Sequence, residues 1–360
     1  MKEKASKLTI ILTIAGREMF TQRWLRYMND IQCPYKILIG DNKNDTFFDN
    51  PKHLFDCYQN LDVEYIRYES DVTMNSYFMK LKSLVDMVDT EYVLFADNDD
   101  FYLLDYFNKY IDFLDNSPDY VSARGSAGKF FICSHFNCNA LSQVAGQRYI
   151  AFNVVNKSIE QQNSLERVDW FLGNIESSDV FFNWYSIARI GKVREILDIL
   201  SFEKDIDPFV HELMYLVLML QEGKIKVFDD FGLLRQEGSS QCLSLLISRH
   251  PHAFRRIFIE NKWQALYNIL DKTFPKEDDN KFIRISVSKQ LEKQIATYNI
   301  QPKLVDKIIN KIKIKYSSIY SVLYVLRMYI YGVFGKQKYI KSPVLDRYVI
   351  SCSKSTVNNF

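Results

Sequence analysis

The sequence predicts an α/β protein built around an open, mostly parallel β-sheet. In the first part of the chain, short apolar runs alternate with helical segments, and successive runs end in polar or acidic loops. Alternation of this kind is typical of a parallel sheet with helices packed against it. The composition agrees, because 47% of the 360 residues are hydrophobic while the chain has only 12 Gly and 8 Pro, which leaves little room for flexible linkers.

The expected elements follow one another in a regular order. Residues 8–14 form a β-branched apolar run of the kind found in buried parallel strands, and a helix is expected at 21–30. Further strands are expected at 35–39, 63–68 and 92–96, with helices near 51–60 and at 75–87. In such sheets ligands bind in the crevice at the carboxyl ends of the strands, so the loops that follow the strands are where we expect function.

One of these loops is rich in carboxylates. The apolar strand 92–96 runs directly into Asp97, Asn98, Asp99 and Asp100. Three carboxylates and an amide within four residues suit a hard divalent cation such as Mg2+ or Mn2+, which prefers oxygen ligands. A solvated acidic turn is the plainer interpretation of the same residues, and the cluster alone does not favour either.

The loops after three strands are expected to converge on one crevice. They carry Gly16-Arg17, Asp41 and the acidic cluster, a combination typical of a site for a nucleoside diphosphate. The chain has no GxGxxG and no GxxxxGK[ST] motif, which counts against a dinucleotide fold and a P-loop NTPase. The plainer interpretations are a surface ion pair for Arg17, a turn-stabilising role for Asp41 and a solvated helix charge for Lys80.

Bulk properties exclude some classes and suggest a compartment. The net charge of +2 gives no reason to expect a nucleic-acid partner. The six Cys are scattered without a CxxC pair, which fits a reducing, cytosolic compartment. No signal peptide and no membrane-spanning helix are expected, because no apolar stretch is long enough.

Taken in order, these pieces resemble the glycosyltransferase A fold and, within it, the bacterial family-2-like transferases. The matching pieces are the opening strand and loop 9–18, Asp41 after the second strand, and Asp97-Asn98-Asp99, which is similar to the Asp-X-Asp motif of the family. Residues 202–212, followed by an apolar helix through Leu220 and a Gly-Lys turn, are similar to its acidic motif. The resemblance covers roughly residues 7 to 245.

The resemblance implies an enzyme that moves a sugar from a nucleotide-diphosphate sugar, with UDP favoured, to a glycan or lipid-linked acceptor in bacterial surface-polysaccharide synthesis. It implies inversion at the transferred sugar and a Mn2+ or Mg2+ cofactor held by Asp97 and Asp99 or by Asp99 and Asp100. The residues that it implies for donor binding are Ala15, Gly16, Arg17, Asp41, Lys80, Asp97, Asn98 and Arg235.

The identity of the catalytic base is open, because His-Glu stands where the family motif has two acidic residues. Glu212 is preferred, with Asp207 and Asp205 as alternatives. Pro208 suits the first position of a helix, which makes Asp207 equally suited to be its N-cap. Glu212 would also fit an ordinary acidic residue in the first turn, favoured by the helix dipole.

The chain changes character after about residue 245. We expect a glycosyltransferase domain over 1–245 and a helical region over 246–360. Residues 308–341 mix Lys, Tyr and aliphatic residues, which is typical of a helix in the plane of an anionic membrane, and equally of a helix packed on the enzyme or a second subunit. The expected location is the cytoplasm, with the inner face of the cytoplasmic membrane as the place of any peripheral docking.

Two other functions stay open. A sugar nucleotidyltransferase would share the crevice and the metal, but it should carry a Gly-rich basic loop after the first strand. A non-catalytic sugar- or lipid-binding scaffold could keep the same fold. The aromatic stretches 169–171 and 181–185 could stack on sugar rings, although core packing is the better interpretation for most of their side chains.

Overall fold

The computed structural model describes residues 7–14, 18–42, 57–69, 74–132, 149–154, 157–174, 178–201, 208–237, 263–274 and 276–299. Nine strands lie within these residues: β1 Leu8–Ile14, β2 Lys36–Asn42, β3 Val63–Tyr68, β4 Tyr92–Ala96, β5 Phe101–Tyr102, β6 Tyr120–Ile132, β7 Tyr149–Val154, β8 Ile187–Arg189 and β9 Lys224–Glu237. The α-helices are α2 Glu18–Asp30, α4 Met74–Asp86, α5 Phe107–Asn116, α7 Ser164–Gly173, α8 Ile190–Ser201, α9 Pro208–Glu222, α12 Trp263–Thr273 and α13 Glu277–Asn299. Two 3₁₀ helices are η1 Leu104–Tyr106 and η3 Ser178–Tyr185.

All nine strands join one sheet in the order β3-β2-β1-β4-β8-β6-β9-β5, with β7 paired to β6. The four neighbouring strands β3, β2, β1 and β4 are parallel to one another. Beyond them, β8 runs antiparallel to both of its neighbours, while β6 and β9 form a second parallel pair. The α/β class and the mostly parallel sheet are therefore confirmed, and the antiparallel pairs gather in the half of the sheet that β5 to β9 form.

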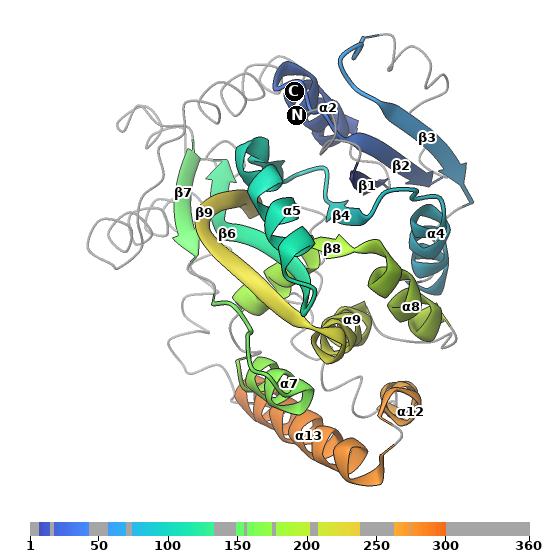
Figure 1. Cartoon of the computed structure of the whole chain (residues 1–360), viewed down its shortest axis with the longest axis vertical. Coiled ribbons are helices and arrows are strands. Elements are labelled where there is room, and N and C mark those ends of the chain that lie inside the picture. Colours follow the sequence, from blue (N-terminus) through green and yellow to red (C-terminus); the bar gives the residue numbers. More distant parts are fainter. Residues whose placement is uncertain are drawn as a thin grey trace, which may run out of the picture.

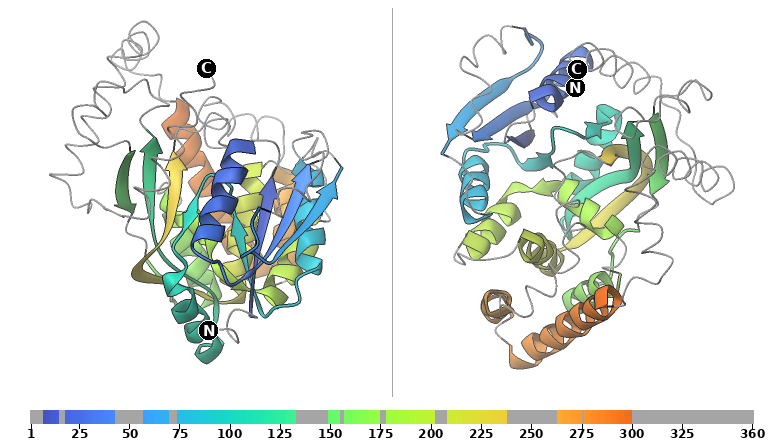
Figure 2. Two further views of the ribbon diagram at one scale, coloured as in Figure 1. Left: turned by 90° about the horizontal axis from the view of Figure 1, so that it is seen from above. Right: turned by 180° about the vertical axis from the view of Figure 1, so that it is seen from behind.

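Helices cover both faces of the sheet (Figures 1 and 2). Helices α2 and α5 lie on one face, and α4, α8 and α9 lie on the other. The connections through α2 and α4 run in opposite directions along the sheet, and right-handed crossovers then place the two helices on opposite faces. Helices α7, α12 and α13 form a further layer outside α9.

The apolar patterns in the sequence match the burial of the strands and helices in the core. Both faces of β1 and β4 are covered, so nearly every residue of these runs is buried and the runs are continuously apolar. Helix α9 lies between the sheet and the outer helices, which is why it is apolar on all sides and buried from Leu213 to Leu220. At Gly40, an added Cβ would lie 2.6 Å from Leu84 Cδ1, so a larger residue would force the buried Leu84 side chain of α4 to shift.

Several predicted boundaries need correction. The strands at 8–14, 63–68 and 92–96 are confirmed as drawn. The strand predicted at 35–39 continues to Asn42, so Asp41 belongs to a strand instead of a turn. The apolar residues in 226–228 predict a short strand and the polar stretch 235–240 predicts a loop, whereas β9 spans Lys224–Glu237 and includes Arg235. Residues 57–60, the last part of the helix predicted near 51–60, form turns, and 51–56 lie outside the described residues.

The described start of the helical C-terminal region packs against the α/β part of the chain. Gln221 at the end of α9 donates through Nε2 to the carbonyl oxygen of Thr273 at 3.0 Å, and Ser286 on α13 donates to Asp169 on α7 at 3.0 Å. The basic segment 308–341 lies outside the described residues. Among the helices that the structure describes, none is both long enough and apolar enough to cross a membrane.

Candidate active site

Three parallel strands bring the predicted site residues to one edge of the sheet. In the pairing register, Ile14 at the end of β1 is level with Asp41 on β2, and Leu12 on β1 is level with Ala96 on β4. The acidic turn that follows Ala96 therefore lies on one side of β1, and Asp41 lies on the other. This edge is where the carboxyl ends of the strands meet, as the alternating pattern predicts.

The acidic turn gathers three carboxylates. Asp97, Asp99 and Asp100 each offer one oxygen atom, and these atoms lie within 4.8 Å of one another. Asp99 is 6% exposed and Asp100 is 1% exposed, while Asp97 is half-buried. The turn continues into β5, which pairs with β9 and so fixes the turn to a strand from a distant part of the chain. These carboxylates are not a solvated surface turn, because two of the three are withdrawn from water.

Helix α2 supports the turn from one face of the sheet. The Asn98 side-chain amide donates to Thr21 Oγ1 at 2.8 Å, so it is used within the protein. The Arg23 guanidinium donates through Nη2 to the backbone oxygen of Asp99 at 2.8 Å. Both contacts hold the turn in place, and neither of them uses a carboxylate of the cluster.

Asp100 has one oxygen satisfied and one without a partner. Its Oδ1 accepts from the Gln236 backbone N–H at 2.9 Å, whereas its buried Oδ2 has no hydrogen-bond partner. Burial raises the pKa of Asp100 well above its usual range, the negative charges of Asp99 and Asp97 raise it further, and Arg235 opposes the rise. A buried carboxylate oxygen without a partner, beside two more carboxylates, is a donor set that suits a hard divalent cation such as Mn2+ or Mg2+.

Glu212 faces the same cluster from helix α9. The helix begins at Pro208, so Glu212 lies beyond the first turn, and the interpretation as a first-turn acid stabilised by the dipole is wrong. Burial raises the pKa of Glu212 to about 7, with Arg235 opposing the rise and the negative charge of Asp97 adding to it. Since Asp97 and Arg235 act on Glu212 and on Asp100 alike, the base candidate and the metal candidate belong to one site.

Arg235 provides the positive charge of this site from strand β9. Its guanidinium carbon lies 5.1 Å from the ring centroid of Tyr185 and 5.8 Å from that of Phe182. The Tyr185 hydroxyl donates to Asp97 Oδ2 at 2.6 Å. One aromatic pair therefore lies beneath the arginine, and one of its members also binds a carboxylate of the cluster.

Asp41 forms a second polar group on the other side of β1. Its Oδ2 accepts a hydrogen bond from the Tyr65 hydroxyl on β3. Burial raises the pKa of Asp41, while this hydrogen bond and the charges of Lys80 and Arg67 oppose the rise. Lys80 is 3% exposed, and its ammonium lies 5.6 Å from the centroid of the Tyr77 ring, so the interpretation as a solvated helix charge is wrong.

Some predicted residues cannot be placed, and some important ones were not predicted. Ala15, Gly16, Arg17, Asp205 and Asp207 lie outside the described residues. Three residues that hold the acidic turn were not predicted, namely Arg23, Tyr185 and Gln236. Only the aromatic density around Tyr185 is visible as a signal in the sequence, and such density is more typical of core packing.

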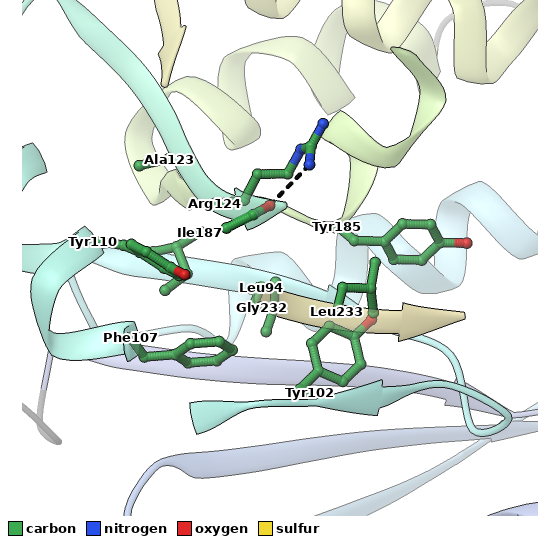
Figure 3. A pocket seen from close by; sticks show the side chains of 11 residues that line it. Leu94, Tyr102, Phe107, Tyr110, Ala123, Arg124, Tyr185, Ile187, Gly232 and Leu233 are labelled. Atoms are coloured by element: carbon green, nitrogen blue, oxygen red, sulfur yellow. Dashed lines mark hydrogen bonds between the residues drawn. The ribbon is translucent and has the colours of Figure 1, made fainter. Parts of the chain in front are cut away.

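A small cavity lies in the core beside the site (Figure 3). It is lined mainly by aromatic and aliphatic side chains from β4, β5, α5, β6, β8 and β9, and Tyr185 stands at its margin. Its volume of about 10 Å³ for the centre of a water-sized sphere is only enough for a single water molecule. This cavity is a packing gap that is too small for a nucleotide sugar.

Comparisons with known proteins identify the fold. The sequence matches no family profile and no curated protein. Among solved structures, S. aureus TarS 1–349 is similar to 88% of this chain and 81% of that chain, with a TM-score of 0.50 and 13% identity. TarS 1–349 in complex with UDP covers 96% of this chain and 87% of that chain at a TM-score of 0.49 and 13% identity. The mannosyltransferase PcManGT from Pyrobaculum calidifontis, in complex with GDP-Man and Mn2+, covers 98% of this chain and 87% of that chain, with a TM-score of 0.45 and 10% identity.

The likeness to the first of these structures shows the fold. It confirms the predicted α/β fold, a mostly parallel sheet with flanking helices.

Proposed function

We propose that the protein is a metal-dependent glycosyltransferase that moves a sugar from a nucleotide-diphosphate sugar to an acceptor hydroxyl. One observation carries the proposal: a glutamate whose pKa is about 7 shares one electrostatic site with three clustered carboxylates, at the carboxyl edge of the sheet. A general base works best when its pKa is near the working pH, and a nucleoside diphosphate as leaving group needs a cation. The two groups together favour a catalyst over a binding scaffold.

The carboxylates would hold the cation. Asp97, Asp99 and Asp100 are the candidate ligands for Mn2+ or Mg2+, and the partnerless buried Oδ2 of Asp100 supports this assignment. A bound divalent cation would supply Lewis-acid stabilisation of the charge that develops on the departing diphosphate. Asn98 supports the site by fixing the turn, because its amide is already bound to Thr21.

Glu212 would act on the acceptor. In its ionised form it takes the proton of the acceptor hydroxyl while that oxygen forms a bond to the anomeric carbon of the sugar. The bond between the anomeric carbon and the diphosphate oxygen breaks in the same step, so the electron pair leaves with the diphosphate and the configuration inverts. A pKa of about 7 leaves a large part of Glu212 ionised at neutral pH.

The donor would lie across the end of β1. Asp41, supported by Tyr65 and next to the charge of Lys80, is placed to hydrogen-bond the base or ribose of the nucleotide. The positive charge of Arg235 acts on both Asp100 and Glu212, and this residue would contact the diphosphate. The sequence resemblance supports UDP as the nucleotide and a glycan or lipid-linked acceptor of bacterial surface-polysaccharide synthesis. The mixture of Lys, Tyr and aliphatic residues in 308–341 supports peripheral contact with an anionic membrane through that segment.

The test is a panel of nucleotide sugars, assayed for hydrolysis and transfer by the full chain with and without EDTA. We expect slow hydrolysis of one donor, stimulated by Mn2+ or Mg2+ and abolished by EDTA and by Asp99→Asn. Glu212→Gln should keep donor binding but stop turnover, and Asp105→Asn, which removes an exposed acid a few residues beyond the cluster, should act like the wild type. Full turnover by Glu212→Gln, or hydrolysis that is unaffected by EDTA, would refute the proposal.

A further inference from the structure

Tyr185 makes two contacts with the site that nothing in the proposed mechanism uses. It is the last residue of η3 and is 6% exposed. Its hydroxyl donates to Asp97 Oδ2 at 2.6 Å, and its ring centroid lies 5.1 Å from the guanidinium carbon of Arg235. In Figure 3 its side chain points away from the other residues that line the core cavity, so its ring borders the core while its hydroxyl reaches the site.

We propose that Tyr185 is a positioning residue, whose hydroxyl fixes the carboxylate of Asp97 in the orientation that binds the metal ion. This inference rests on the proposed metal-dependent function. The bond from the phenol to Oδ2 restricts the rotation of the Asp97 carboxylate about its last side-chain bond, so the other oxygen is directed one way. Residues that orient metal ligands in this way affect metal affinity by about 10- to 100-fold.

The surroundings of Tyr185 are rigid enough for this role. The residue before it, Trp184, packs edge-on against Tyr215 of α9 with ring centroids 4.5 Å apart, and also contacts Phe95 of β4 at 5.1 Å. The residue after η3 begins the approach to β8, which is paired to β4. Tyr185 is therefore held between the strand that carries the acidic turn and the helix that carries Glu212. A side chain fixed in this way restricts the carboxylate that it binds.

The ring and the hydroxyl have separable tasks. Tyr185→Phe removes the hydroxyl and keeps the ring beneath Arg235, so it tests the bond to Asp97 alone. The chain also offers a matched control: Tyr92 on β4 is 1% exposed, and its hydroxyl donates to Asp115 at 2.8 Å, at the opposite end of the same strand. Tyr92→Phe removes the same atom from the same kind of bond, away from the site.

The experiment measures Mn2+ binding to the full chain by electron paramagnetic resonance of the free ion, with no substrate present. We expect the dissociation constant to rise about 10- to 100-fold in Tyr185→Phe and to stay within twofold of the wild type in Tyr92→Phe. Unchanged Mn2+ affinity in Tyr185→Phe, while the wild type binds, would overturn the positioning role and leave the proposed function intact. A wild type that binds no Mn2+ would overturn both.

A double-mutant cycle identifies the partner through which Tyr185 acts. If the hydroxyl acts by orienting Asp97, then Asp97→Asn already removes its effect, and the double variant with Tyr185→Phe should bind Mn2+ as weakly as Asp97→Asn alone. Losses that multiply in the double variant would show that Tyr185 acts on the metal site by another route, which contradicts the inference. Circular dichroism of each variant checks that the compared chains are folded.

Discussion

Replacing Glu212 by glutamine should make the protein more stable at high pH while it removes the proposed base. In the unfolded chain a glutamate ionises near pH 4.5, whereas burial in the native structure raises the pKa of Glu212 to about 7. Between these two values the native state binds a proton that the unfolded state releases, so the free energy of unfolding falls as the pH rises. The stability that the protonated carboxyl contributes is complete below pH 4.5 and is lost as the pH rises through about 7.

The size of the effect follows from the same two values. A tenfold change in proton affinity is worth about 1.4 kcal/mol, so a rise from 4.5 to about 7 corresponds to about 3 kcal/mol. Glutamine has nearly the same shape and no charge. As the pH rises from 4.5 to 8.5, the free energy of unfolding of Glu212→Gln should therefore increase by about 3 kcal/mol relative to that of the wild type. The gain is expected to develop mostly between pH 4.5 and about 7, where the native wild type holds a proton that the unfolded chain has released, and to level off above that range.

The assay is urea denaturation followed by tryptophan fluorescence, for which the chain offers 4 Trp. Wild type and Glu212→Gln are compared at each pH in the presence of EDTA, so that other titrating groups cancel and no cation binds to the cluster. Glu166→Gln, an exposed glutamate on α7, measures the effect of removing one carboxylate elsewhere. If the stability difference between wild type and Glu212→Gln is the same at pH 5 and pH 8.5, Glu212 is not a buried acid and our reasoning about its pKa fails.

Three further substitutions test the packing that positions the site, each by urea denaturation. Gly40→Ala should lose about 1–3 kcal/mol, because its Cβ would lie 2.6 Å from Leu84 Cδ1, and a loss below 0.5 kcal/mol would refute the close approach of α4 to β2. Arg167→Ala should lose about 3 kcal/mol, because the buried guanidinium donates to the Leu220 carbonyl oxygen at 2.7 Å and to three other backbone oxygens; an unchanged midpoint would contradict that network. Asn163→Ala should lose about 1 kcal/mol with the N-cap of α7, and Asn163→Ser should restore it.

The sequence predicts the strands that form the core better than the strands that form the site. Residues 8–14 and 92–96 are buried on both faces, so a continuous apolar run marks their whole length. Strands β2 and β9 continue past their apolar residues, because the backbone ladder does not require apolar side chains. Asp41 pairs with Arg67, and Arg235 pairs with Lys129, in registers that a hydrophobic pattern cannot show. The predicted ends of these two strands were therefore too early.

The acidic cluster and Asp41 were predictable, because their carboxylates directly follow or end an apolar run. The side chains that orient them were not, because they come from elements far away in the sequence. Tyr185 is 88 residues from Asp97, and Gln236 is 136 residues from Asp100. A tyrosine in an aromatic stretch and a glutamine after a strand carry no local signal of such contacts. These contacts depend on the complete sheet, which no single segment of the chain specifies.

The short strand β5 links the acidic turn, which the sequence predicts, to the end of β9, which it does not. Its two residues follow the acidic turn immediately and pair with Leu233 and Leu234, the residues just before Arg235. This pairing brings the end of β9 to the turn, so that the Gln236 N–H reaches Asp100 and the Arg235 charge acts on Asp100 and Glu212. Buried carboxylates this close together repel one another, and the pairing of two residues holds them there only because β9 is anchored along β6 over most of its length. The cation that we propose would relieve that repulsion, so its binding should stabilise this edge of the sheet.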